Sequence, residues 1–137
     1  MMKKAISVLI ILVIALTIFA ACGKEDITLE SMKKSLKDAG YEVYNEVYDI
    51  ADQIENMTGG FTFVYKGAHG DMTIPVFEFK DKNAANDYAK DINTSSGGGQ
   101  FAILNGKFLS VAEAHGGNPH QDEKEFLDKL LNGRSIK

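Results

Sequence analysis

An apolar run close to the amino terminus constrains this chain more than any other feature. Residues 5–21 are apolar except for Ser7 and Thr17, and Lys3 and Lys4 stand directly before them. Basic residues followed by a short apolar stretch are typical of an export signal. A membrane-spanning helix needs about 20 apolar residues, so the run is marginal for that role. We therefore expect residues 1–21 to be a signal peptide, which leaves the remainder of the chain to fold.

The only cysteine of the chain follows this run directly. Phe19-Ala20-Ala21-Cys22-Gly23 resembles the lipobox of bacterial lipoproteins, although Phe19 stands where that pattern usually has an aliphatic residue. The resemblance implies cleavage by the lipoprotein signal peptidase before Cys22. It also implies a diacylglyceryl group on the Cys22 sulfur, with fatty acyl chains such as palmitate. A lone exported Cys has no internal disulfide partner, and lipidation removes its exposed thiol. The alternative is an uncleaved anchor with an incidental Cys.

Both interpretations place the body of the protein at the extracytoplasmic face of the cell membrane. Two acyl chains hold a protein on a bilayer, because each buried CH₂ contributes about 0.8 kcal/mol. Residues 22–27 are expected to form the lipidated Cys and a short polar tether. Residues 28–137 are expected to form a single domain.

Charge argues against one class of partner. The whole chain carries a net charge of −4, and without Lys3 and Lys4 residues 22–137 carry −6. Binding to a phosphate backbone requires clustered Lys and Arg, so nucleic acid is not an expected partner. The membrane, through the anchor, and an envelope protein are the expected partners. The oligomeric state stays open.

Three segments show helical periodicity. Thr28 is a suitable N-cap for a helix that ends at Gly40, and Asp81 is a suitable N-cap for a second helix with Ala and Tyr88 on one face. Asn118-Pro119 is typical of a helix start, and that third helix ends at Gly133. A short fourth helix is expected at residues 47–54.

Strands are expected where aromatic and β-branched residues gather or alternate. These segments are residues 41–45, 61–66, 71–80, 101–104 and 107–111. Asn105-Gly106 predicts a type I′ turn between the last two. Pro75 cannot donate a ladder hydrogen bond, so its strand is expected to be an edge or to carry a bulge. The Gly-rich segment at residues 94–99 is expected to be mobile.

This order of elements predicts an α+β domain. We expect a mainly antiparallel sheet of four to five strands with helices on one face. A ferredoxin-like core with an added helix at each end is one such arrangement. The order also resembles that of small uncharacterised lipoproteins of Gram-positive bacteria.

No motif for catalysis is found, so no enzyme activity, catalytic residue or resident cofactor is expected. His115 and His120, with Asp122 and Glu123 nearby, are the candidates for a metal site, although their spacing matches no strong metal signature. The other interpretation of this segment is a flexible loop before a helix, with its acids explained by solvation and the helix dipole. His69 is interpreted as a solvated turn residue.

Aromatic density suggests a surface for contact with a partner. Phe61, Phe63 and Tyr65 are expected to face inward. The candidates for partner contact are Tyr41, Tyr44 and Tyr48. The first functional hypothesis is therefore a non-catalytic interaction module. The second is a lipoprotein that binds a small ligand or metal at the His115–His120 loop, and the third is an enzyme with dispersed residues. An enclosed pocket with convergent acid and His groups favours the second.

Overall fold

The structure is a computed structural model that describes residues 26–46 and 54–137. The expected signal peptide, Cys22, Tyr48 and most of the short helix expected at 47–54 lie outside these residues. The described part contains the helices α2 (Leu29–Asp38), α3 (Lys82–Ser95) and α4 (Gln121–Leu131). It also contains the strands β1 (Val43–Tyr44), β2 (Met57–Gly67), β3 (Gly70–Phe79), β4 (Gln100–Asn105), β5 (Phe108–His115) and β6 (Asn118–Pro119). The α+β class predicted from the sequence is confirmed.

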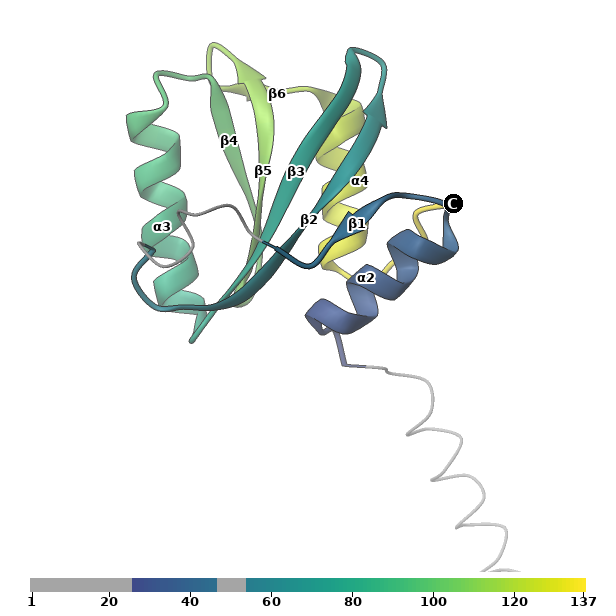
Figure 1. Ribbon diagram of the computed structural model, residues 1–137. Coiled ribbons are helices and arrows are strands. Elements are labelled where there is room, and N and C mark those ends of the chain that lie inside the picture. Colours follow the sequence, from purple (N-terminus) through teal and green to yellow (C-terminus); the bar gives the residue numbers. More distant parts are fainter. Residues whose placement is uncertain (1–25, 47–53) are drawn as a thin grey trace, which may run out of the picture.

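All described strand pairs are antiparallel, in the order β1-β2-β3-β5-β4, with β6 paired to the end of β5 (Figure 1). The sheet has six strands, one more than expected, because β6 was assigned to a helix start. A ferredoxin-like core would place the first strand inside the sheet beside a parallel neighbour. Here β1 is a two-residue edge strand, so the ferredoxin-like arrangement is wrong.

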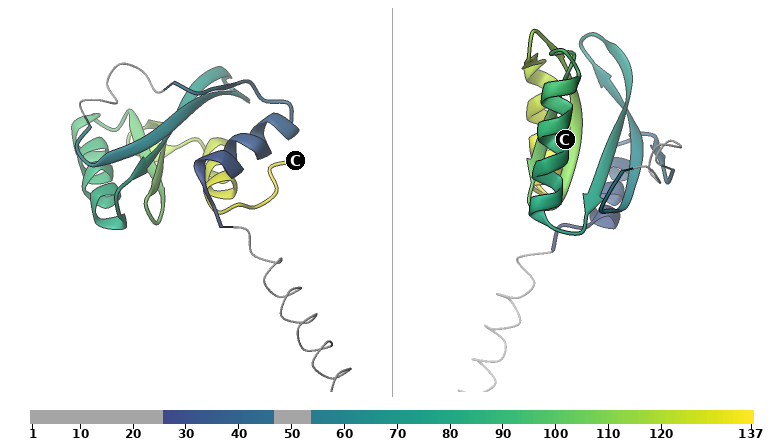
Figure 2. Two further views of the ribbon diagram at one scale, coloured as in Figure 1. Left: turned by 60° about the horizontal axis from the view of Figure 1, so that its bottom comes forward. Right: turned by 90° about the vertical axis from the view of Figure 1, so that its left-hand side faces the viewer.

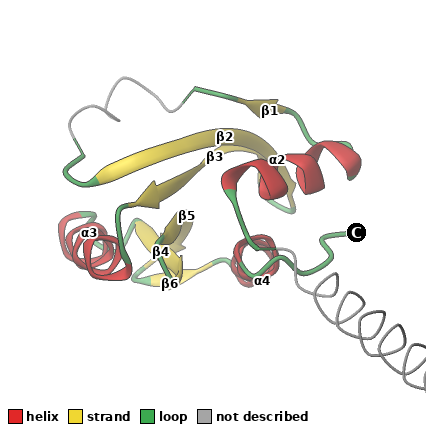
Figure 3. Cartoon of the chain, turned by 90° about the horizontal axis from the view of Figure 1, so that it is seen from below, coloured by secondary structure: helices red, strands yellow, loops and turns green. Residues whose placement is uncertain are grey.

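Helices cover both faces of the sheet, whereas the sequence predicted one. Strand side chains alternate between the faces, so neighbours such as Val76 and Phe77 enter different cores. Val76 packs with Phe61, Phe63 and the residues of α2 and α4. Phe77 packs with Phe79 and the small Ala positions of α3. Figure 3 shows α3 and α4 on opposite sides of β4 and β5. The predicted inward set of Phe61, Phe63 and Tyr65 is confirmed.

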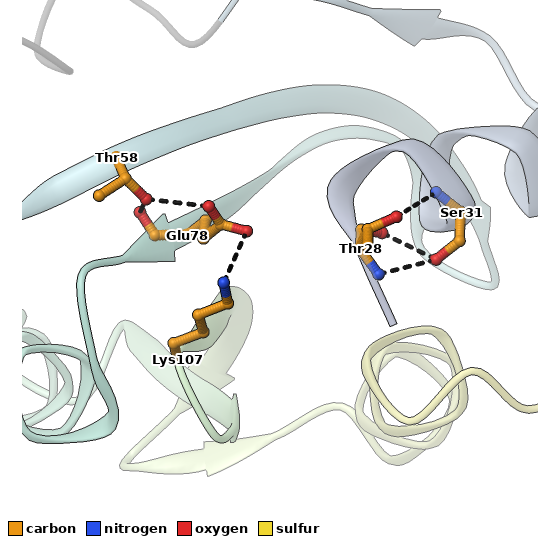
Figure 4. Close-up of polar contacts among 5 residues, drawn as sticks. All are labelled: Thr28, Ser31, Thr58, Glu78 and Lys107. Carbon is orange, nitrogen blue, oxygen red and sulfur yellow. Dashed lines mark hydrogen bonds and ion pairs between the residues drawn. The ribbon is translucent and has the colours of Figure 1, made fainter. Parts of the chain in front are cut away.

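The three helices use the predicted apolar stripes. Thr28 caps α2, since its Oγ1 accepts from the Ser31 N–H at 3.0 Å while the Ser31 Oγ accepts from the Thr28 N–H at 2.9 Å (Figure 4). Asp81 caps α3, accepting from the Ala84 N–H at 2.8 Å. Helix α4 differs from the prediction, because it begins at Gln121 with His120 as its N-cap.

The reason for this shift is a tight hairpin between β5 and β6. His115 pairs with Asn118, and Gly116 and Gly117 between them have φ of 58° and 81°. Positive φ at both central residues is the type I′ geometry that glycine favours. Asn118 and Pro119 therefore extend a strand ladder and are not the first residues of the helix.

The Gly-rich segment before β4 packs against this hairpin. The Gly98 carbonyl accepts from the Gly117 N–H, and the Gly99 carbonyl accepts from the Ala114 N–H, both at 3.1 Å. A Cβ added to Gly98 would lie 2.9 Å from the Gly117 nitrogen. The segment was expected to be a mobile linker, but its small residues allow two loops to approach closely.

The β4–β5 turn and the start of β2 also differ from the sequence prediction. The β4–β5 hairpin forms as expected, but its loop residues are Gly106 and Lys107, and only Gly106 has positive φ, the pattern of a type II′ turn. Gly59 and Gly60, expected before a strand, lie inside β2. The register shifts between Met57 and Gly59, so the bulge lies in β2 and not at Pro75.

Polar contacts join the strands at the end of the sheet where β3 and β5 are paired. The Thr58 Oγ1 donates to the Glu78 Oε1 at 3.0 Å, and Lys107 Nζ lies 3.5 Å from the Glu78 Oε2 (Figure 4). Thr58 belongs to β2, Glu78 to β3 and Lys107 to the β4–β5 turn. This end of the sheet is therefore held closed by side chains as well as by the backbone ladder.

Candidate functional site

Pro75 marks the point at which β3 and β5 separate. The two strands pair only at Val76–Ser110, Phe77–Leu109 and Glu78–Phe108. Pro75 lacks the N–H that would continue the ladder toward Val111. Its carbonyl accepts instead from the Ser110 Oγ at 2.7 Å. Strand β3 is thus an edge from Gly70 to Pro75 and an internal strand from Val76 onward. Figures 1 and 2 show the β2–β3 hairpin leaning away from β4 and β5.

A cleft of about 240 Å³ opens where the strands diverge, and we call it the Glu123 cleft. Its walls come from β3, β5, α3, the first residue of β4 and the first turn of α4. The lining residues are Met72, Thr73, Ile74, Pro75, Phe77, Tyr88, Ile92, Gln100, Val111, Ala112, Glu113 and Glu123. Most are apolar. The two charged ones are both carboxylates, and none of the described lining residues is Lys, Arg or His.

Glu123 is the buried polar group of this cleft. Its side chain is 1% exposed. The Oε1 accepts from the backbone N–H of Glu113 at 2.9 Å, while the Oε2 has no partner among the described residues. Burial raises the pKa of the Glu123 carboxyl, and the hydrogen bond from Glu113 offsets part of this rise. Leaving a buried polar atom without a partner is costly, so such an atom requires an explanation.

The spacing of Glu123 in the sequence is a signal for its burial. Glu123 precedes Phe126 by three residues, Leu127 by four and Leu130 by seven, so it lies on the apolar stripe of α4. We interpreted it as a solvated residue of the first turn. A carboxylate on the apolar stripe of a helix either extends to solvent or is buried, and the Glu123 side chain is buried.

Asp122, one residue earlier, fixes the tip of the β2–β3 hairpin. The Tyr65 hydroxyl donates to the Asp122 Oδ2 at 3.2 Å. Burial and the Asp122 charge raise the pKa of Tyr65 to about 12. Slight burial acts to raise the Asp122 pKa, but hydrogen bonds from the Tyr65 hydroxyl and from the backbone N–H groups of Ala68, Glu123 and Asp122 together lower it. The first turn of α4 therefore binds both sides of the cleft, β5 through Glu123 and the hairpin tip through Asp122.

The three His residues gather at this end of the molecule. The rings of His115 and His120 are 5.0 Å apart, and His69 approaches His120 to 4.2 Å. The sequence placed His115 and His120 in one loop, but the structure adds His69 from the β2–β3 turn. Within residues 26–46 and 54–137, no group of three or more His, Cys, Asp or Glu residues is placed to hold a metal ion.

The tyrosines proposed for partner contact are in different environments. Tyr41 packs into the larger core, with its ring 5.2 Å from that of Phe126, so it is not a free surface residue. Tyr44 is 50% exposed on β1, and its hydroxyl donates to the Glu42 Oε2 at 2.9 Å. Tyr48 and the lipidation candidate Cys22 lie outside the described residues. One of the three candidates is therefore seen at the surface.

The cleft offers one buried carboxyl among apolar walls. Such a group can accept a hydrogen bond, pair with a cation or hold a proton. Among the described contacts of Glu123 there is no Ser, Thr, Tyr or Lys side chain that it could activate as a nucleophile. The arrangement is therefore suited to binding a ligand that supplies a donor for the Oε2.

This chain matches no protein-family model, no curated protein and no solved structure. No helix in the described residues is both long and apolar enough to cross a membrane.

Proposed function

We propose that this chain is a lipid-anchored extracytoplasmic protein whose folded domain binds a small cationic ligand in the Glu123 cleft without catalysing a reaction. The anchor part of the proposal is supported by the resemblance of residues 19–23 to a lipobox and by the position of the single Cys. The binding part is supported by Glu123, which lines the cleft and whose buried Oε2 has no partner among the described residues.

The chemistry of the lining selects the kind of ligand. A buried carboxylate without a positive partner gains most from a ligand that carries one. The apolar side chains of β3, β5 and α3 favour a ligand with a hydrocarbon body. A volume near 240 Å³ is below the roughly 300–1,000 Å³ of sites for drug-sized molecules, so the ligand is small. A primary ammonium group on a short branched alkyl chain satisfies all three requirements.

The binding part is tested by calorimetry on the full-length chain in detergent micelles. The probes are 3-methylbutylamine and 3-methylbutanol, which share an alkyl body and differ in charge. We expect the amine to bind, and Glu123→Gln to weaken it about tenfold or more, as for the loss of a charge-assisted hydrogen bond. The matched control is Glu125→Gln, an exposed acid on the same helix. Equal binding of amine and alcohol, or no loss in Glu123→Gln, would contradict the proposal.

The anchor part is tested separately in a bacterial host. Full-length chain should incorporate a radiolabelled fatty acid and sediment with membranes. Cys22→Ser should lose the label, and globomycin should preserve the uncleaved form. Wild-type chain that carries no label and shows no change in gel mobility with globomycin would refute the anchor.

The convergence of imidazoles favours metal binding at His115 and His120 as a second candidate function. A tetrahedral zinc site needs three or four fixed ligands, and the described residues bring two or three rings together without a further acid placed to complete such a site. Titration of the full-length chain with Zn²⁺ and Cu²⁺ would detect it. Micromolar binding that is lost in His115→Ala and His120→Ala supports this candidate, and the absence of heat removes it.

A further inference from the structure

We propose that the ligand of the Glu123 cleft is a short peptide with a free amino terminus, bound as an extra strand segment between β3 and β5. This inference rests on the proposed function and specifies the ligand class. The cleft has backbone hydrogen-bonding groups on two sides and a carboxylate at one end, which is the pattern that a peptide amino terminus complements.

The direction of the backbone groups follows from the ladder. The Phe79 N–H donates to the Lys107 carbonyl at 2.9 Å, so alternate residues of β3, namely Phe77, Pro75 and Thr73, direct their backbone groups toward β5. On β5, Leu109, Val111 and Glu113 face β3 in the same way. Val76 and Ser110 form the last paired position, and Phe77 and Leu109 are the last pair whose backbone groups face each other.

Beyond that pair the two edges have no strand between them. Pro75 has no N–H to donate to Val111, and its carbonyl is taken by Ser110. The Glu113 N–H is taken by Glu123, and the Glu113 carbonyl accepts from the His120 N–H at 3.3 Å. Val111 on one side and Thr73 on the other therefore present backbone groups to the cleft, and both residues line it. Strand β6 pairs with β5 only at Ala114 and His115, so it leaves Val111 without a described ladder partner on this side.

Glu123 places a carboxylate beside the unpaired stretch between β3 and β5. Its Oε1 already occupies the place where a β3 carbonyl would accept from Glu113. Its Oε2 has no partner among the described residues, and Glu123 lines the cleft. The Glu113 side chain adds a second carboxylate to the lining. The terminal ammonium group of a peptide is attracted to this end, while a peptide carboxylate is repelled. The apolar lining then accommodates the first side chain.

The test compares three probes on the full-length chain. Leucyl-alanine amide carries an ammonium group, a branched side chain and peptide groups, and 3-methylbutylamine carries the first two alone. N-acetyl-leucyl-alanine amide lacks the ammonium group. We expect leucyl-alanine amide to bind at least tenfold more tightly than the amine, and acetylation to abolish most of the binding. Equal affinity for the dipeptide amide and the amine would overturn the peptide assignment while leaving the proposed function intact. If neither probe binds, both fail.

Two further measurements address the strand pairing itself. Methylation of the Leu–Ala amide nitrogen removes the backbone donor, and we expect it to reduce the affinity of the wild-type chain to that of the amine. Thr73→Pro removes the N–H that faces the cleft and keeps the groups that face β2. This variant should lose the preference for the dipeptide amide and retain amine binding, while Thr73→Ala retains both. A methylated dipeptide that binds as tightly as its parent would overturn the inference, whether or not Thr73→Pro folds.

Discussion

The carboxylate of Glu123 on α4 accepts a hydrogen bond from the backbone N–H of Glu113 on β5 at 2.9 Å. A helix side chain thus occupies a ladder position that a neighbouring strand would normally fill. The His120 N–H donates to the Glu113 carbonyl, so both backbone groups of Glu113 are bonded to residues 120 and 123 and not to a neighbouring strand. Strand β3 separates from β5 at Pro75. The first turn of α4 therefore helps to keep the sheet open, and the second oxygen of the same carboxylate is left without a partner among the described residues.

Glu123→Gln should stabilise the chain at neutral pH even as it weakens ligand binding. The folded state raises the pKa of Glu123 above its usual value of 4.5, chiefly through burial. Stability from this group is therefore full below pH 4.5 and is lost as the pH rises through the folded pKa. Gln keeps the acceptor for Glu113 and removes the buried charge. Urea unfolding at several pH values should show a gain on the order of 1 kcal/mol at pH 7 and a flatter pH dependence. A less stable variant at pH 7 would contradict this account.

Tyr65→Phe should loosen the hairpin tip while preserving the core. The Tyr65 ring lies 4.8 Å from Phe126, and Phe retains that contact. The hydrogen bond to Asp122 is lost, which is expected to cost about 0.5–1.5 kcal/mol in thermal or urea unfolding. Asp122→Asn removes the charge that helps to raise the pKa of Tyr65. Ultraviolet titration should then show Tyr65 ionising below the value of about 12 in the parent chain. An unchanged titration would show that the contact is not formed.

Gly98→Ala should be more destabilising than Gly97→Ala. Both residues have positive φ, 83° and 62°, so both substitutions impose backbone strain of about 1–2 kcal/mol. A Cβ at Gly98 also meets the Gly117 nitrogen at 2.9 Å, whereas a Cβ at Gly97 meets nothing within 4 Å. Differential scanning calorimetry of the two variants isolates the contact between the Gly-rich segment and the β5–β6 hairpin. Equal melting temperatures would indicate that this segment is the mobile linker expected from its composition.

Glu78→Ala should weaken the closed end of the sheet. Glu78 joins Thr58 and Lys107, and a partly exposed network of this kind contributes about 0.5–1 kcal/mol. The loss of stability in Glu78→Ala should be smaller at high salt, because salt screens the ion pair between Glu78 and Lys107 and so reduces its contribution. Lys107→Ala is the matched variant, since it removes the ion pair and keeps the Thr58 contact. If the two variants lose the same amount of stability, Thr58 contributes nothing.

The helices were predictable because their signals are local. Thr28 and Asp81 cap helices through the backbone of residues three positions away, and the inward residues of α4 follow from spacing alone. The strand segments and the hairpin at Gly106 were predictable for the same reason. The sheet order was not, because which strand lies beside β3 depends on contacts distant in sequence, such as Phe77 with Leu109.

The candidate site was missed for a related reason. Pro75 was recognised as a ladder breaker, but its consequence depends on where β5 lies. Glu123 stood on an apolar stripe, yet its partner is a backbone N–H ten residues away that becomes accessible only when Gly116 and Gly117 form a hairpin. The gathering of His69 with His115 and His120 likewise joins segments distant in sequence, as does the Tyr65–Asp122 contact nearby.

We propose that Glu123 is a buried carboxylate that pairs with a cationic group of a ligand, and carbon-13 NMR of its carboxyl group measures this pairing. In the free full-length chain, its pKa should lie above 4.5, and saturating leucyl-alanine amide should lower it by pairing the charge. An ordinary pKa that does not respond to this ligand or to 3-methylbutylamine would contradict the claim.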